Sequence, residues 1–229
     1  MKPLHAILIF GAICFLATLV TWQILPTAKK SHIKNLVRPY VETVISLRKN
    51  RAVTNGPLCT SKLAGRNLEY SPIADRTNAK GCKVSNAIRL SKVGDLELSK
   101  PADLTCEMAL NLSIWVESFV KPKARSIFNE EITKLSHLGS YNCRPMRGKK
   151  TRLSQHAFAN AFDVAGFRLA SGEKLDLKKD WKAGGKKEQF WRSIHKGACK
   201  NFDLVLGPEF DKRHKDHFHL DAGYYKSCR

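Results

Sequence analysis

The chain has 229 residues, 43% of them hydrophobic and only 9 Pro and 14 Gly, so it can build a packed core and is not broadly disordered. Its 40 Lys and Arg against 20 Asp and Glu leave a formal net charge of +20, which predicts a polyanionic partner or surface nearby. It carries no zinc-finger, basic-zipper or RNA-recognition signature, so no nucleic acid is expected as a partner.

An apolar segment lies near the start of the chain. HAILIFGAICFLATLVTWQIL, residues 5–25, contains no Asp, Glu, Lys or Arg, and its length approaches the ~20 residues that cross a bilayer. A signal-peptide cleavage site is weak, because only Thr27-Ala28 offers small residues. We expect a transmembrane anchor over residues 1–26, with a cleaved signal peptide as the alternative.

Residues 27–56 predict a basic juxtamembrane connector. Apolar residues recur close to a helical period in SHIKNLVRPYVETVISLRKN, interrupted by Pro39. Such a piece either lies against anionic head groups or packs on the domain that follows. Basic residues cluster at 29–38, whereas only Lys2 precedes the apolar segment, and by the positive-inside rule this would place the rest of the chain in the cytoplasm.

The cysteines indicate the opposite compartment. Cys14 lies in the apolar segment, and the other six are widely spaced, with no CxxC pair: Cys59, Cys82, Cys106, Cys143, Cys199 and Cys228. A scattered, even set beyond a membrane segment is typical of disulfides in an oxidising compartment. We expect three disulfides of unspecified pairing, with buried free thiols as the alternative, and give the cysteines more weight than the loop charges. The body of the protein is then expected outside the cytoplasm.

The globular domain is expected over residues 57–229. Residues 57–100 are rich in Gly, Asn and Ser with short apolar alternations, which predicts short strands and turns. Residues 101–120 and 123–135 have apolar spacings of three and four, which predicts two helices separated by a break at Lys121-Pro122.

The second half of the domain alternates turns, one helix and strands. We expect a strand or loop at 138–143, a hairpin at 161–177 turning at Ser171-Gly172, a helix at 186–202, and strands at 203–208 and 217–225. The fold class is therefore predicted as α+β, with helices packed on a mostly antiparallel sheet.

Two stretches contain polar side chains among apolar residues, and such side chains need hydrogen-bond or ionic partners when they are buried. SQHAFANAFD (154–163) sets His156 and Asp163 among small and apolar residues. A straight helix would hold them two turns apart, and a straight strand would point them to opposite faces, so the chain must turn between them. In DKRHKDHFHLD (211–221), His217 and His219 share a face if the stretch is a strand.

Three of these four side chains make a His, Asp, His set. A catalytic zinc site has three such ligands and leaves a fourth position for water, whose pKa the ion lowers. Asp216 lies three residues before His219, where a bend could bring its carboxylate to that water as a general base. His214 is expected on the loop surface, with a role in substrate binding as the alternative.

These residues carry a resemblance. SQHAFANAFD fits S-x-H-x-x-(G/A)-x-A-x-D, and DHFH fits (E/D)-x-x-H with an overlapping H-x-H, the patterns of zinc D-Ala-D-Ala carboxypeptidases and related peptidoglycan peptidases. More closely, SYNCRP … LSQHAFANAFDVAGF … LGPEF … HKDHFHLD resembles the bacterial extensin-like C-terminal domain, over about residues 57–223.

The resemblance implies that zinc (Zn2+) is held by His156, Asp163 and His219. It further implies that Asp216 is the base and that His217 lies in the second shell or donates a hydrogen bond to the transition state. The zinc-peptidase type of fold is expected on the same ground.

Two substrate-binding residues come from the same resemblance. Arg144 in SYNCRP matches a position that binds a peptide carboxylate or a developing oxyanion. Ser154 is the serine of the first motif and is expected to orient its neighbours rather than attack. The chain departs from the family at Ala159, where Gly is commoner, and at Asp216, where many relatives have Glu.

The combined expectation is an inner-membrane-anchored zinc metallopeptidase with its catalytic domain in the periplasm. It would cleave stem-peptide bonds of peptidoglycan for local cell-wall remodelling, by analogy during assembly of an envelope-spanning machine. A polyanionic wall suits the +20 charge. The alternatives are a non-catalytic wall-binding module on the same fold and a basic nucleic-acid binder.

Overall fold

A computed structural model of the chain describes residues 61, 63, 65–149 and 151–229. The expected anchor and connector, and Cys59, lie outside these residues. Within the described part, no helix combines the length and apolar character needed to cross a membrane.

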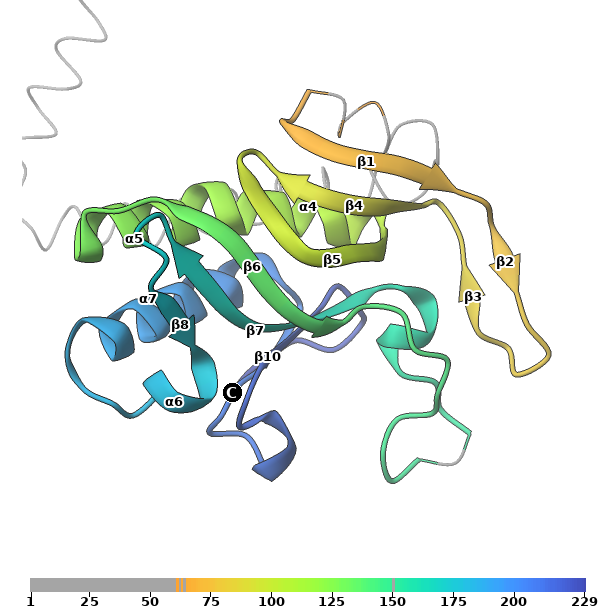
Figure 1. Cartoon of the computed structure of the whole chain (residues 1–229). Helices are drawn as coiled ribbons and strands as arrows, with labels where there is room; N and C mark the ends of the chain where they lie inside the picture. Colours follow the sequence, from red (N-terminus) through yellow and green to blue (C-terminus); the bar gives the residue numbers. More distant parts are fainter. Residues whose placement is uncertain (1–60, 62, 64, 150) are drawn as a thin grey trace, which may run out of the picture. The chain divides into compact units, whose positions relative to one another are not determined.

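One nine-stranded sheet organises the described residues (Figure 1). Its order is β1-β4-β5-β6-β7-β10-β9-β11, with β8 pairing to β7 off this path. The strands are β1 (Leu68–Ile73), β4 (Ala87–Val93), β5 (Leu96–Thr105), β6 (Ile132–Gly139), β7 (Ala161–Leu169), β8 (Lys174–Asp176), β9 (Leu204–Leu206), β10 (Phe218–Asp221) and β11 (Ser227–Cys228). A small second sheet pairs β2 (Arg76–Thr77) with β3 (Lys83–Val84).

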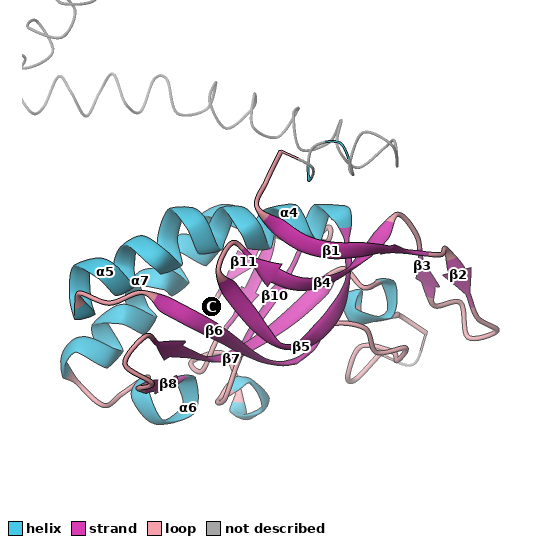
Figure 2. Ribbon diagram, turned by 45° about the horizontal axis from the view of Figure 1, so that its top comes forward, coloured by secondary structure: helices cyan, strands magenta, loops and turns pink. Residues whose placement is uncertain are grey.

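The large sheet is mostly antiparallel, as predicted. Its parallel pairs are β5 with β6 and β9 with β11. The helices are α4 (Cys106–Trp115), the π-helical η1 (Val116–Val120), α5 (Lys121–Phe128), α6 (Leu177–Asp180) and α7 (Gly185–Asn201), with 3-10 turns η2 (Gln155–Phe158) and η3 (Lys212–His214). Figure 2 shows α4, α5 and α7 running along the sheet, and α4 contacts both β4 and β5. The described part is therefore a mixed α and β domain.

The core lies between these helices and the sheet. Its largest side chains, including Trp115, Phe162, Trp191 and Phe218, are fully buried. Because side chains alternate along a strand, burial of Phe162 on β7 and of Phe218 on β10 directs the residues next to them to the other face of the sheet.

The predicted helix at 101–120 begins later than expected. Strand β5 continues to Thr105, whose Oγ accepts a hydrogen bond from the Met108 backbone N (3.2 Å) and so caps α4. The predicted break at Lys121-Pro122 is absent. In the π-helical turn before it, the Lys121 backbone N–H donates a hydrogen bond to the Val116 carbonyl. Pro122 lies in the first turn of α5, where the lack of a backbone N–H is tolerated.

The predicted helix at 123–135 is wrong in its second half. The helix ends at Phe128, Asn129 adopts a left-handed conformation (φ 60°), and residues from Ile132 form β6. The apolar residues of β6 recur every three positions and imitate a helix because bulges shift its register against β7.

The remaining predicted elements correspond to observed ones. The hairpin at 161–177 is β7 and β8, with Gly172 at φ +91° in the turn, and α7 covers the helix expected at 186–202. Strands β9 and β10 fall within the two stretches expected as strands, and residues 68–100 consist of short strands and turns.

Two of the three expected disulfides are present. Cys82 bonds Cys143, and Cys199 bonds Cys228. The expectation of a third is wrong for Cys106, which is a free thiol enclosed by the core at the start of α4. Burial raises the pKa of this thiol to about 11.

Candidate metal centre

Two candidate ligands lie on neighbouring strands. Asp163 on β7 is directly opposite His219 on β10, and the carboxylate Oδ1 lies 3.0 Å from His219 Nδ1. Both side chains leave the sheet on the face that the large helices do not cover, since Phe162 and Leu220 beside them enter the core. Strand pairing alone therefore fixes this half of the site.

The third candidate ligand comes from a turn. His156 belongs to η2, whose first turn is capped by Ser154, and Ala159 ends the turn in a left-handed conformation (φ 54°). This reversal returns the chain to β7 and sets His156 Nε2 3.2 Å from Asp163 Oδ2 and 3.2 Å from His219 Nδ1. The structure thus brings His156, Asp163 and His219 together across the turn that their sequence spacing required.

Hydrogen bonds outside the set fix which ring nitrogens carry protons. His156 Nδ1 lies 2.6 Å from the Ser140 carbonyl oxygen, which can only accept, so Nδ1 donates. His219 Nε2 likewise donates to Asp221 Oδ2 (3.2 Å), and Asp221 Oδ1 accepts from the Gly223 backbone N (2.9 Å). In neutral rings, His156 Nε2 and His219 Nδ1 are then left with lone pairs that face each other and the carboxylate.

Such an arrangement of acceptors is stable only with positive charge at its centre. One ligand atom from each of the three side chains lies within 4.8 Å of the other two, and His156 is buried. A proton or a metal ion can supply the charge. Two imidazole nitrogens and one carboxylate oxygen, each ring held by a partner on its other nitrogen, are a donor set that suits zinc.

Without metal, the pKa values of His219 and Asp163 show how the charges of these side chains stabilise each other. Burial alone would lower the pKa of His219, but hydrogen bonds with Asp163 and Asp221 raise it to about 9. Burial alone would raise the pKa of Asp163, but hydrogen bonds with His156 and His219 hold it well below its usual range. Without metal, a proton on His219 therefore occupies the place of the cation.

A second group of possible ligands cannot bind metal in the same way. His195, Cys199 and Cys228 also lie close together. However, the two cysteines are bonded to each other, so neither offers a thiolate. Among the described residues, the His156, Asp163 and His219 set is therefore the remaining candidate.

Asp216 and His217 form a pair beside the set. His217 Nδ1 lies 2.8 Å from Asp216 Oδ1, and His217 Nε2 lies 3.7 Å from Asp163 Oδ1. Within the described residues, no hydrogen bond or ion pair joins Asp216 directly to the three candidate ligands. The expected base thus reaches the set through His217.

The two expected substrate-binding residues lie on the segment that leads into η2. Ser154 is buried, and its Oγ accepts a hydrogen bond from the His156 backbone N (3.4 Å). Arg144 is partly exposed, and its backbone oxygen accepts from Ser154 N (3.1 Å). Among the described residues, its guanidinium contacts none of the three candidate ligands.

Sequence reasoning missed two contributors to the site and favoured a surface position for a third residue near it. Asp221 could have been found, because it lies two residues after His219 on a strand and so shares its face. The Ser140 carbonyl could not, since a backbone acceptor has no residue signature. His214, expected on the surface, is half-buried: its Nδ1 lies 2.7 Å from Asp211 Oδ1, and its ring centroid is 5.2 Å from that of His217.

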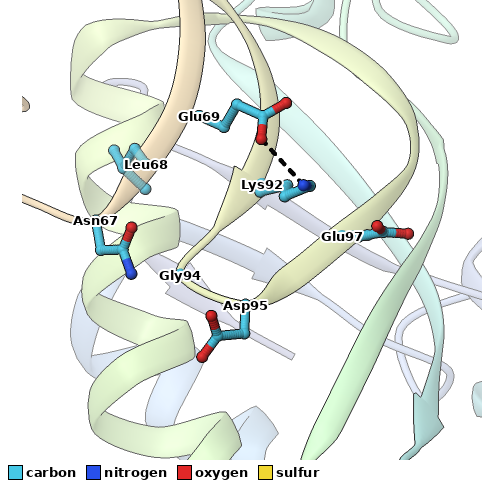
Figure 3. A pocket seen from close by; sticks show the side chains of 7 residues that line it. All are labelled: Asn67, Leu68, Glu69, Lys92, Gly94, Asp95 and Glu97. Atoms are coloured by element: carbon cyan, nitrogen blue, oxygen red, sulfur yellow. Dashed lines mark ion pairs between the residues drawn. The ribbon is translucent and has the colours of Figure 1, made fainter.

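A depression of the described surface lies away from this centre, at the β1, β4 and β5 end of the sheet, and has a volume of about 400 Å³. Figure 3 shows the residues that line it, among them the ion pair of Glu69 with Lys92. Its lining residues are Asn67, Leu68, Glu69, Lys92, Gly94, Asp95 and Glu97. It shares no residue with the candidate metal centre.

Fold and site together define a mixed α and β domain with a candidate cation site between two central strands. The family described as Extensin-like protein C-terminus matches residues 57–229, and the chain belongs to this family. Comparison with curated proteins and with solved structures finds no match.

Proposed function

We propose that the chain is a zinc-dependent peptidase that hydrolyses stem-peptide bonds of peptidoglycan. The observation that carries the proposal is the convergence of two imidazole lone pairs and one carboxylate, with each imidazole oriented by a second hydrogen bond. A structural group would not need three acceptors directed at one point.

Within this proposal, His156, Asp163 and His219 hold the ion. A bound zinc ion supplies a Lewis acid that polarises a carbonyl group and acidifies water. Asp221 and the Ser140 carbonyl keep the two imidazoles in the tautomers that present a lone pair to the ion.

Asp216 and His217 act as one proton-transfer unit. When His217 Nδ1 donates to Asp216, its Nε2 is left free to accept a proton or, once protonated, to donate a hydrogen bond to a developing oxyanion. Asp216 holds this imidazole in place by accepting the hydrogen bond from its Nδ1. Arg144 binds a carboxylate of the substrate, which requires its guanidinium to turn toward the bound peptide.

The setting proposed for this chemistry is the periplasmic side of the inner membrane. An anchor at residues 1–26 would limit cleavage to wall close to the membrane, which suits local opening of the wall for an envelope-spanning machine.

The test uses purified muropeptides and the full-length protein, with products resolved by mass. Cleavage should occur with zinc, stop with a chelator and return on zinc addition. His156→Ala and Asp163→Asn should lose both zinc and activity, whereas Asp95→Asn, at an exposed site in the distant depression, should keep both. Activity in either ligand variant would refute the assignment.

A second candidate is a wall-binding module without turnover. The exposed position of Asp216, whose side chain is 49% accessible, favours it, because a base is usually more enclosed. Zinc retention together with binding to the wall but no cleavage would support this candidate.

A further inference from the structure

A hairpin of basic residues adjoins the candidate metal centre and has no part in the chemistry proposed above, apart from Arg144. The basic hairpin, residues 144–154, pairs its two arms at Pro145 and Leu153. A hydrogen bond from the Met146 N to the Arg152 oxygen (2.7 Å) continues the pairing toward the tip. The described residues of its two arms are therefore paired to each other, and the base is tied by the Cys82–Cys143 disulfide.

Its charge is not neutralised within the described part of the chain. The segment RPMRGKKTR, residues 144–152, holds five basic residues and no acidic one. No ion pair joins Arg147, Lys149 or Arg152 to a described carboxylate, and all three are exposed. Elsewhere in the domain, several arginines are paired with acids, as Arg89 is with Asp103. Clustered cations of this kind favour an anionic ligand.

Two exposed tyrosines adjoin the hairpin. The Arg152 guanidinium lies 4.5 Å from the ring centroid of Tyr225, which is 49% exposed. Tyr224 is 95% exposed, so almost nothing packs on its ring. A flat ring with an apolar face and a hydroxyl at its edge suits contact with a sugar ring.

Both features adjoin residues that support candidate zinc ligands. The hairpin ends at Ser154, which caps the turn of His156, and the tyrosines follow Asp221, which orients His219. A polymer with its scissile bond at the metal centre could therefore reach this surface.

We propose that the basic hairpin, together with Tyr224 and Tyr225, is a docking surface for peptidoglycan strands. The cations bind carboxylates of stem peptides next to the one being cut, and the tyrosines lie against the sugar rings. The identity of the polymer rests on the proposed function; the docking itself needs no turnover.

The experiment measures co-sedimentation of the full-length protein with purified insoluble peptidoglycan, in an Asp163→Asn background that cannot cleave it. Adding Arg147→Glu and Lys149→Glu should weaken binding about tenfold at physiological salt and remove most of its salt dependence. The matched control, Lys178→Glu with Lys179→Glu on α6, makes the same charge change at two exposed positions and should alter binding less than about twofold.

Tyr224→Ala tests the aromatic part. It should weaken binding several-fold and leave the salt dependence intact, because it removes no charge. Equal losses in the hairpin variant and the α6 control would overturn the proposal, since binding would then follow net charge alone. So would a hairpin variant that loses binding to duplex DNA or anionic vesicles but keeps its binding to peptidoglycan.

A second measurement separates this proposal from the proposed function. In an otherwise unchanged chain, Arg147→Glu with Lys149→Glu should cleave a short soluble stem peptide at the normal rate while losing activity on the insoluble polymer. A chain that docks through the hairpin but cleaves neither would overturn the peptidase and support the docking surface.

Discussion

The candidate metal centre has two halves that are built differently. Asp163 and His219 are positioned by strand pairing in the middle of a nine-stranded sheet. His156 is positioned by a single 3-10 turn, a left-handed residue and a loop that a disulfide holds to the rest of the domain. The strand half depends on backbone register and the core beneath it, whereas the turn half depends on a few local contacts.

This difference teaches where the site can be weakened without unfolding the domain. Strand positions are supported by many ladder hydrogen bonds, so changes there act through the side chain alone. Turn positions have little such support, so changes several residues away can displace His156. The predictions below use this contrast, from the largest expected effect to the smallest.

Removing a candidate ligand should have the largest effect, and the same effect in both halves. His219→Ala and His156→Ala should each lower zinc affinity by more than the ~100-fold that marks the upper end for outer-shell partners. Titration against a zinc-binding dye measures this. Retention of tight binding in one variant would show that its half does not contribute a ligand.

Asp221→Ala should weaken zinc binding by about 10–100-fold, because His219 loses the partner that fixes its tautomer. Asp221→Asn keeps an oxygen acceptor and should lose less. The same dye titration separates the two, with Asp95→Ala as the unaffected control. An Asp221→Ala variant with normal affinity would mean that the strand register alone orients the ring.

Zinc affinity should fall with acidification by about tenfold per pH unit below pH 9, because a proton must leave His219 before the ion binds. The metal-free fold should behave oppositely. Since the pKa of His219 is raised to about 9, its stabilising charge is complete below the ordinary value near 6.5 and is lost as pH rises through 9.

Two measurements check this pair of trends: zinc affinity against pH, and denaturant unfolding of chelator-treated protein at low and high pH. The metal-free protein should lose a few kcal/mol of stability across that window. A zinc affinity that does not change between pH 6.5 and pH 9 would show that zinc and a proton do not compete for His219.

Breaking each disulfide should separate stability from metal binding. Cys82→Ser with Cys143→Ser and Cys199→Ser with Cys228→Ser should each cost about 2–4 kcal/mol of unfolding free energy. Only the first pair should also lower zinc affinity, by a few-fold, because Cys143 lies three residues from the Ser140 carbonyl that orients His156. Equal affinities in the two variants would show that the loop keeps its position unaided.

Ala159→Gly should have the smallest effect. The left-handed conformation of residue 159 disfavours Ala, and Gly relieves this while costing backbone entropy, so stability should rise by at most about 1 kcal/mol. Thermal unfolding measures the change, and zinc affinity should stay within about twofold. A marked loss of stability would mean that the methyl group packed against Val84 and Ala87 matters more than the strain.

The sequence drew attention to three side chains that do lie together, whereas it misplaced the first helices. His156, Asp163 and His219 stand out because polar residues among apolar ones need a partner. The strand at Ile132–Gly139 did not stand out, because its bulges replace the two-residue alternation with a helix-like spacing. Asp216 was expected to reach the set alone, and its hydrogen bond to His217 becomes evident only in the folded structure.

Other features could not follow from residue patterns. The spacing of the cysteines contains no information on pairing, and the enclosed position of Cys106 depends on how α4 packs in the core. Pro122 lies within a continuous helical segment because of a π-helical turn that no local propensity predicts.

The pairing of β7 with β10 joins residues that are 56 positions apart in the chain. A ribosome that has released Asp163 has yet to add the segment that carries its opposite imidazole. If the proposed zinc site is right, nascent or truncated polypeptides that stop before residue 219 would lack its third ligand, and acquisition of the ion would report that synthesis has passed that point.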